Sequence, residues 1–117
     1  MIVGVPKEIK EQEYRVALPP SAAYQLIGRG HQVLVETNAG VGAGFPDSDY
    51  EAAGGKIVKD HKAVFERAEM ISKVKEPQES ETALLRPGQI LFTYLHLAAS
   101  KPLTDALMRS GVMTWIA

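Results

Sequence analysis

Short apolar runs alternate with amphipathic stretches along the whole chain, as strands alternate with helices in α/β proteins. The apolar runs predict six β-strands, at residues 2–5, 32–36, 56–58, 70–74, 89–94 and 112–117. The stretches between them predict five helices, at residues 21–29, 47–53, 61–66, 81–85 and 100–110. Because the order is β-α-β-α, we expect a doubly wound, mainly parallel sheet with helices on both faces, the Rossmann-like or flavodoxin-like arrangement.

Polar caps and glycines mark the ends of the predicted helices. In the first helix Ala23, Leu26 and Ile27 share one face, and Gly30 is the expected stop signal. The starts of the other four carry residues that can cap a helix, namely Asp47 or Ser48, Asp60, Ser80 and Ser100. The caps and the apolar spacing therefore predict the same set of helices.

Composition narrows the class of protein. The 117 residues suit one domain and are too few for a conventional two-domain enzyme. The chain is 45% hydrophobic and 23% charged, which is typical of a folded soluble domain. Without cysteine, and without histidines or carboxylates at metal-ligand spacing, neither a disulfide nor a metal site is expected. The net charge of −1 gives no general attraction to nucleic acid or to an anionic membrane.

The two ends of the sequence suggest location and extent. The first apolar run is brief and charged residues follow it, so no secretory signal is predicted. The longest apolar runs are far below the roughly 20 residues of a membrane-spanning helix, and we expect a cytoplasmic protein. The last apolar run reaches the final residue without a polar tail, whereas domains usually end in exposed polar segments. The chain is therefore expected to be the front portion of a longer protein.

A glycine-rich segment at residues 40–45 follows a predicted strand and precedes a predicted helix, as the dinucleotide-binding fingerprint G-x-G-x-x-G does. Asp60 lies about 20 residues beyond Gly40, where the ribose-binding acid of that fingerprint would stand. The third glycine position, however, holds Phe45, and Pro46 follows it. The segment therefore predicts a tight turn and not a cofactor-binding loop.

Three side chains suited to carboxylic acid chemistry follow the ends of predicted strands. Arg15, with apolar neighbours in the loop after the first strand, suits bidentate binding of a carboxylate. Lys75 follows the fourth strand, where an ammonium can polarise a carbonyl oxygen, and His96 follows the fifth as a candidate for proton transfer. Singly, each residue type is more often a surface or packing group. Because parallel strands end at one shared edge, the three together predict a site for a small 2-oxo acid.

Four segments carry a family resemblance: VPKEIKEQEYRVALPP, AGVGAGFPDSDYEAAG, KVKEPQ and LLRPGQILFTYLHLA. In this order they resemble the N-terminal part of the alanine dehydrogenase / pyridine nucleotide transhydrogenase family, and within it the alanine dehydrogenases. The resemblance covers essentially all 117 residues. It implies that residues 1–117 are the N-terminal segment of a substrate domain, and that an NAD-binding domain absent from this chain is inserted after it.

The resemblance also implies an activity and a set of site residues. Alanine dehydrogenases interconvert L-alanine with pyruvate and ammonia, with NAD as the hydride acceptor. In that family an arginine matching Arg15 binds the substrate carboxylate, and a lysine matching Lys75 contacts the reacting centre. A histidine matching His96 transfers protons, and a tyrosine matching Tyr94 lies in or near the pocket. The family further implies a hexamer, no cofactor-binding residues in this segment, and no hydride transfer by the 117 residues alone.

Other readings stay open. The dinucleotide-binding subunit of a transhydrogenase resembles the opening segment, although the Lys-Glu-Pro and Tyr-Leu-His-Leu patterns at Lys75 and His96 argue against it. Lysine-forming saccharopine dehydrogenase shares the domain type but resembles the four segments less closely. A non-catalytic binding module with the same fold is an alternative of another class.

Overall fold

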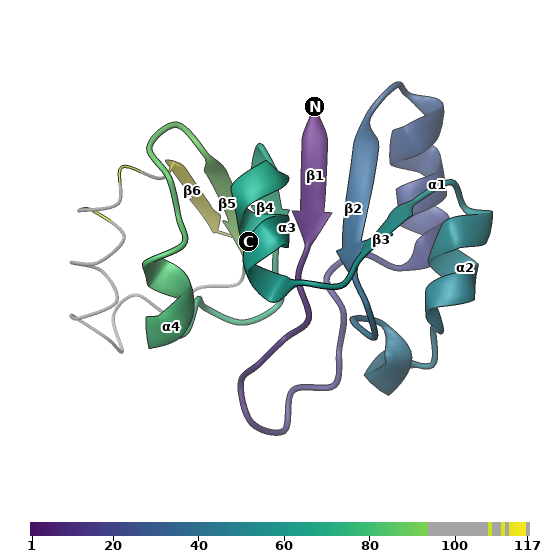
Figure 1. The fold of residues 1–117 in the computed structure, drawn as a ribbon, viewed down its shortest axis with the longest axis horizontal. Helices are drawn as coiled ribbons and strands as arrows, with labels where there is room; N and C mark the ends of the chain where they lie inside the picture. The colour runs from purple at the N-terminus through teal and green to yellow at the C-terminus, as the bar shows by residue number, and fades with distance from the viewer. Residues whose placement is uncertain (94–107, 109–110, 112, 117) are drawn as a thin grey trace.

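The computed structural model describes residues 1–93, 108, 111 and 113–116. Within them, six strands form one parallel sheet in the order β3-β2-β1-β4-β5-β6. The strands are β1 (Ile2–Val5), β2 (Gln32–Glu36), β3 (Lys56–Val58), β4 (Met70–Ser72), β5 (Ile90–Thr93) and β6 (Met113–Ile116). From β1 the chain builds outward to β3 on one side and then to β6 on the other (Figure 1). The predicted doubly wound α/β sheet is confirmed.

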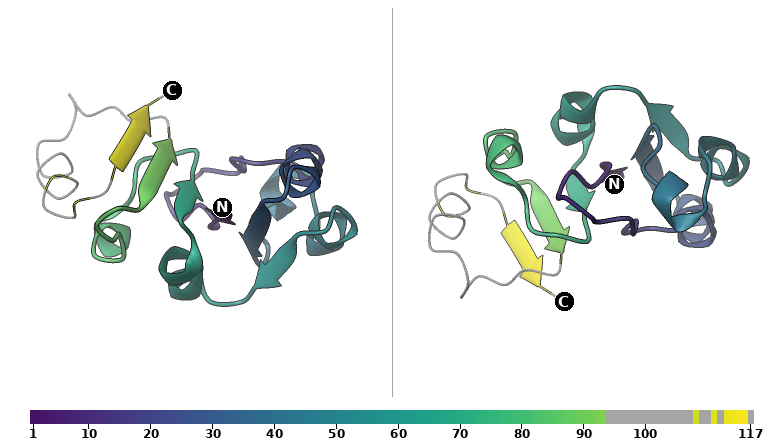
Figure 2. Two further views of the ribbon diagram at one scale, coloured as in Figure 1. Left: turned by 90° about the horizontal axis from the view of Figure 1, so that it is seen from above. Right: turned by 90° about the horizontal axis from the view of Figure 1, so that it is seen from below.

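Helices cover both faces of this sheet. They are α1 (Pro20–Gly28), α2 (Asp47–Ala52), α3 (His61–Arg67) and α4 (Glu79–Thr82). Successive residues of β2 point to opposite faces. Val33 and Val35 join the apolar cluster that holds Tyr50 of α2, whereas Leu34 joins the cluster that holds Phe65 of α3. Two cores on opposite faces therefore hold α1 and α2 on one side and α3 on the other (Figure 2).

Several predicted boundaries match the structure closely. The strands predicted at 2–5, 32–36 and 56–58 have the bounds that the structure shows. Helix α1 is followed by Gly30, whose φ of 93° lies in the left-handed region. The N–H groups of Gly30 and His31 donate to the carbonyls of Ile27 and Leu26, which closes the helix end. The predicted stop signal at Gly30 is therefore confirmed.

The predicted cap of α2 is wrong. Pro46 precedes the helix, and neither Asp47 nor Ser48 stands at the cap position. The Asp47 carboxylate instead accepts hydrogen bonds from the Thr37 hydroxyl at 2.6 Å and from the Asn38 N–H at 2.8 Å. A carboxylate in the first turn thus ties α2 to the loop after β2. In contrast, the cap predicted for α3 is confirmed, because the Asp60 side chain accepts from the Lys62 N–H.

The fourth strand and the fourth helix are shorter than expected. Strand β4 ends at Ser72 and not at residue 74, and α4 ends at Thr82 and not at residue 85. Gln78, and not Ser80, caps α4, and its N–H donates to the Glu81 carboxylate at 2.9 Å. The predicted helix over 100–110 lies outside the described residues, apart from Met108.

Candidate functional site

The chain segments that follow β1 and β4 meet at the carboxyl edge of the sheet. The two strands pair directly, with Val3 opposite Met70 and Gly4 opposite Ile71. The order of strands reverses between them, and this is the place where open α/β sheets bind ligands. The long loop from β1 to α1 extends beyond this edge (Figure 1). Because β1 and β4 are adjacent, the two loops that follow them lie close together at this edge of the sheet.

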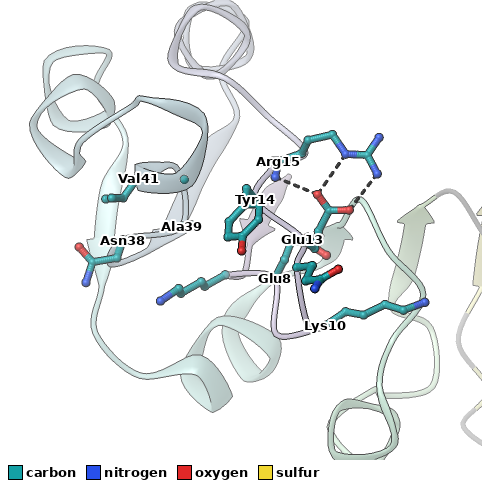
Figure 3. Close-up of a pocket in the computed structure, with 11 residues that line it drawn as sticks. Glu8, Lys10, Glu13, Tyr14, Arg15, Asn38, Ala39 and Val41 are labelled. Carbon is teal, nitrogen blue, oxygen red and sulfur yellow. Dashed lines mark hydrogen bonds and ion pairs between the residues drawn. The ribbon is translucent and has the colours of Figure 1, made fainter.

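Arg15 and Lys75 line one cleft at this edge. The cleft measures about 470 Å³, and residues 10–14 of the first loop complete its wall. We call it the site cleft. Arg15 also borders a pocket of about 610 Å³ that Asn38 and Val41 line (Figure 3). It borders another pocket, of about 390 Å³, that Phe45 lines. The structure therefore brings together two of the three side chains that the sequence singled out.

The Arg15 guanidinium shows how it holds a carboxylate. Its Nε lies 3.0 Å from Glu13 Oε2, and a terminal nitrogen lies 2.8 Å from Glu13 Oε1 (Figure 3). This two-pronged contact is the geometry in which a guanidinium recognises a carboxylate. Hydrogen bonding from Arg15 lowers the pKa of Glu13 to about 2, and the charge of Lys75 contributes in the same direction. Arg15 and Lys75 thus both favour the ionised form of a carboxylate at this place.

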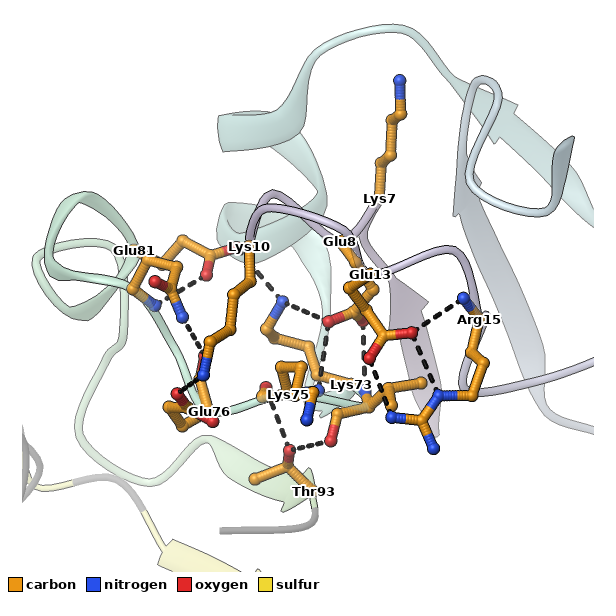
Figure 4. Close-up of polar contacts among 12 residues, drawn as sticks. Lys7, Glu8, Lys10, Glu13, Arg15, Lys73, Lys75, Glu76, Glu81 and Thr93 are labelled. Carbon is orange, nitrogen blue, oxygen red and sulfur yellow. Dashed lines mark hydrogen bonds and ion pairs between the residues drawn. The ribbon is translucent and has the colours of Figure 1, made fainter. Parts of the chain in front are cut away.

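Lys75 is half-buried, and its own backbone is fixed by side chains. Its N–H donates to Glu8 Oε1 at 3.1 Å, and its carbonyl accepts from the Thr93 hydroxyl at 3.1 Å (Figure 4). Its charge also helps to lower the pKa of Glu76, against the effect of burial, which acts to raise it. The side chain predicted to polarise a carbonyl thus sits in a defined place among charged neighbours.

Beneath the site cleft runs a chain of charged side chains that sequence reasoning missed. The Lys73 ammonium, only 1% exposed, lies 3.2 Å from the Glu8 carboxylate and 3.3 Å from that of Glu81. His61 bridges onward, with Nε2 at 2.9 Å from Glu81 and Nδ1 at 2.5 Å from Glu36. We call these five residues the charge chain. No regular spacing links them in sequence, so only the folded chain could bring them together.

The charge chain shifts the pKa of its histidine. Hydrogen bonds to Glu36 and Glu81 raise the pKa of His61 to about 9, so His61 is protonated at neutral pH. Burial acts to raise the pKa of Glu81, but the hydrogen bond from His61 and the charge of Lys73 hold it below its ordinary value. Each buried carboxylate therefore faces a cation, as buried charges require.

The stability of the domain should fall as the pH rises through about 9, because His61 then loses the proton that both carboxylates bind. A raised pKa contributes its full stabilisation below the ordinary value of 6.5 and none above the folded-state value. Midpoints of urea unfolding test this expectation when they are measured from below pH 6.5 to above pH 9, for the wild type and for His61→Gln. The variant should show a flatter pH dependence, and parallel curves would contradict it.

The glycine-rich segment is a packed turn. Val41–Ala43 form a 3₁₀ turn, and Gly44 adopts a φ of 91°. A Cβ on Gly40 would stand 2.8 Å from the Tyr50 ring, and one on Gly42 would stand 2.8 Å from the Tyr14 carbonyl. These glycines allow close packing, and the segment presents no phosphate cradle of the dinucleotide type.

The other two predicted site residues, Tyr94 and His96, lie outside the described residues. In the sequence, Tyr94 directly follows Thr93, the last residue of β5, and Leu95 separates it from His96. Within the described part of the chain, no three or more His, Asp or Glu side chains are grouped so as to hold a metal ion. Nor does that part contain a helix with the length and apolar character needed to cross a bilayer.

Comparison with known proteins supports one family. The profile described as "Alanine dehydrogenase/PNT, N-terminal domain" matches residues 4–117. The chain is 58% identical to the alanine dehydrogenase of Halomonas elongata and 56% identical to that of Bacillus subtilis, over 95% and 96% of its length. It spans only 30% and 29% of those two proteins.

Solved structures agree. An L-alanine dehydrogenase superimposes with a TM-score of 0.96 at 52% identity, covering 99% of this chain and 32% of its own. A transhydrogenase from Sinorhizobium meliloti superimposes with a TM-score of 0.92 at 29% identity, covering 99% of this chain and 34% of its own. The fold is thus common to both kinds of protein, and the higher identity lies with the alanine dehydrogenase. The chain belongs to the alanine dehydrogenase/PNT family, as its N-terminal domain.

Proposed function

We propose that residues 1–117 form the substrate-binding segment of an NAD-dependent alanine dehydrogenase. In this reaction L-alanine, NAD⁺ and water give pyruvate, ammonium, NADH and a proton. The observation that carries the proposal is the site cleft, where Arg15 and Lys75 meet from two neighbouring strand ends. A guanidinium and an ammonium at one small cleft match the carboxylate and the carbonyl of a 2-oxo acid.

Each residue takes one part of the chemistry. Arg15 binds the pyruvate carboxylate in place of the Glu13 carboxylate, with the same two-pronged geometry. Lys75 stabilises the negative charge that develops on the carbonyl oxygen when ammonia adds to the carbon. His96 moves protons to and from that oxygen and the nitrogen, and Tyr94 contacts the substrate. NAD supplies the exchange of hydride with the substrate carbon, and the family resemblance assigns its binding to a domain outside these 117 residues.

The proposal extends to the whole protein. We propose that the protein acts in the cytoplasm, as the sequence predicts, and that it is a hexamer, as the family resemblance implies, with pyruvate, L-alanine and ammonia as its small-molecule partners. Light scattering after size-exclusion chromatography of the naturally encoded protein measures the assembly. These properties are independent of the site cleft, so a different assembly would leave the proposed chemistry standing.

The deciding assay follows NADH oxidation by the naturally encoded protein. Pyruvate with ammonium should support it, and omission of either should abolish it. The 117-residue chain alone should show none, because a dehydrogenase needs its cofactor held against the substrate. The transhydrogenase alternative instead requires hydride exchange between two nicotinamide nucleotides with no 2-oxo acid present. That result, without pyruvate reduction, would overturn the proposal.

Replacement of Arg15 with lysine should raise KM for pyruvate more than it lowers kcat, because a lysine cannot reproduce the two-pronged contact. Loss of one charged hydrogen bond predicts a rise in KM of about 10-fold or more. Arg29→Lys is the matched control, because Arg29 is exposed at the end of α1, outside the residues that line the site cleft. Equal KM values for Arg15→Lys and the control would remove Arg15 from substrate binding.

A further inference from the structure

After β4 the backbone leaves the sheet, and its amides are held by a side chain. The Lys73 N–H still donates to the Phe92 carbonyl of β5 at 3.0 Å. The next two N–H groups both donate to one side chain: Val74 donates to Glu8 Oε2 at 3.0 Å and Lys75 donates to Glu8 Oε1 at 3.1 Å (Figure 4). One carboxylate from the loop after β1 thus holds two successive backbone N–H groups.

A second side chain holds the same dipeptide from the opposite strand. The Thr93 hydroxyl lies 3.1 Å from the Lys75 carbonyl and 3.4 Å from the Val74 carbonyl (Figure 4). Thr93 is fully buried at the end of β5, so its hydroxyl has little access to water. Glu8 therefore binds the two N–H groups of Val74 and Lys75, and Thr93 binds their two carbonyls.

The burial of these groups explains why both contacts are needed. The Glu8 side chain is 3% exposed and the Lys73 side chain is 1% exposed, and their 3.2 Å ion pair balances the charge of the carboxylate. Every fully buried side-chain nitrogen and oxygen among the described residues has a hydrogen-bond partner. A buried polar group that loses its hydrogen-bond partner costs free energy, so the contacts of Glu8 and Thr93 oppose any displacement of Val74 and Lys75.

We propose that Glu8 and Thr93 are positioning residues that fix the Lys75 ammonium at the site cleft. The inference rests on the proposed function, because it assigns Lys75 a reacting partner. Glu8 belongs to the same loop as Arg15, so its hydrogen bond to the Lys75 N–H also sets the distance between the Arg15 guanidinium and the Lys75 ammonium. Displacement of a reacting group by about 1 Å can lower a rate about 100-fold, so this spacing matters for turnover.

Thr93→Val is the decisive variant, because it removes the hydroxyl while keeping the shape of the side chain. In the naturally encoded protein it should lower kcat/KM for pyruvate by about 10-fold or more. Thr93→Ser keeps the hydroxyl and should restore kcat/KM close to the wild-type value. Thr82→Val is the matched control, since the Thr82 hydroxyl also donates to a backbone carbonyl, that of Glu79, in an exposed hydrogen bond away from Val74 and Lys75. It should leave kcat/KM unchanged.

Hydrogen exchange gives a readout that does not depend on activity. The Val74 and Lys75 amides should exchange faster in Thr93→Val than in the wild type, and the Thr82→Val protein should behave like the wild type. Faster exchange with an unchanged kcat/KM would overturn the positioning role, and so would unchanged exchange. If the wild-type protein does not reduce pyruvate, the proposed function is overturned instead. The exchange rates of the Val74 and Lys75 amides still report whether Thr93 holds this dipeptide in place.

Discussion

Replacement of Lys75 with alanine should lower kcat for the amination of pyruvate by about 10²–10³-fold, the effect of removing one donor aimed at developing negative charge. The oxygen of the carbonyl group gains charge as ammonia adds, and the Lys75 ammonium is a cation at the site cleft that can stabilise that charge. Steady-state rates with saturating pyruvate, ammonium and NADH measure the loss. KM for pyruvate should change less, because Arg15 still binds the carboxylate.

Lys59→Ala is the matched control for this experiment. Lys59 is an exposed lysine after β3, outside the residues that line the site cleft, and its loss should leave kcat unchanged. Lys75→Arg, which keeps the charge but changes its geometry, should recover only part of the rate. If the alanine variant turned over pyruvate at the wild-type rate, Lys75 would have no part in the reaction.

Replacement of Lys73 with methionine should destabilise the domain by about 3–5 kcal/mol, the usual effect of removing one partner from a buried ion pair. Methionine fills much of the space of the lysine side chain, so the loss reflects charge more than volume. Glu8 and Glu81 would then face each other's charge without the ammonium that lies 3.2 Å and 3.3 Å from them. Urea unfolding near neutral pH measures the difference.

Lys62→Met provides the comparison. Lys62 and Glu66 form an ion pair at 3.9 Å with side chains 65% and 60% exposed, and such surface pairs contribute about 0–1 kcal/mol. Both substitutions remove a lysine ammonium from its carboxylate partners, two buried ones for Lys73 and one exposed one for Lys62. The difference in the loss of stability therefore reports burial together with the second partner. Similar losses of stability in both variants would contradict the assignment of Lys73 as a buried cation.

The strands were predictable because apolar runs carry their own signal. The runs at 2–5, 32–36 and 56–58 are bounded by polar residues, glycine or proline, and the structure shows the same limits. The error in β4 has a physical reason. The predicted strand continues to Val74, but the N–H of Val74 donates to the Glu8 carboxylate, more than sixty residues earlier in the chain. The sequence around Val74 contains no pattern that predicts a hydrogen bond to a residue so distant in the chain.

The candidate site was predictable in part. Arg15 and Lys75 could be paired because the topology of a parallel sheet brings loops after neighbouring strands together. Lys73 received no role, because a lysine near a strand end is ordinarily a surface group. Its burial depends on Glu8 and Glu81, and neither lies at a spacing that indicates contact. Charge compensation of this kind becomes visible only when the backbone is known.

The charge chain has a consequence for how the sheet comes apart. Its members come from both halves of the sheet: Glu36 ends β2 in one half, while Lys73 follows β4 and Glu81 lies in α4 in the other, with His61 between them. Partial opening of either half would separate one of these charged side chains from its partner while it is still buried, which is strongly disfavoured. The charge chain thereby couples the two halves, so that contacts made in one half disfavour opening of the other.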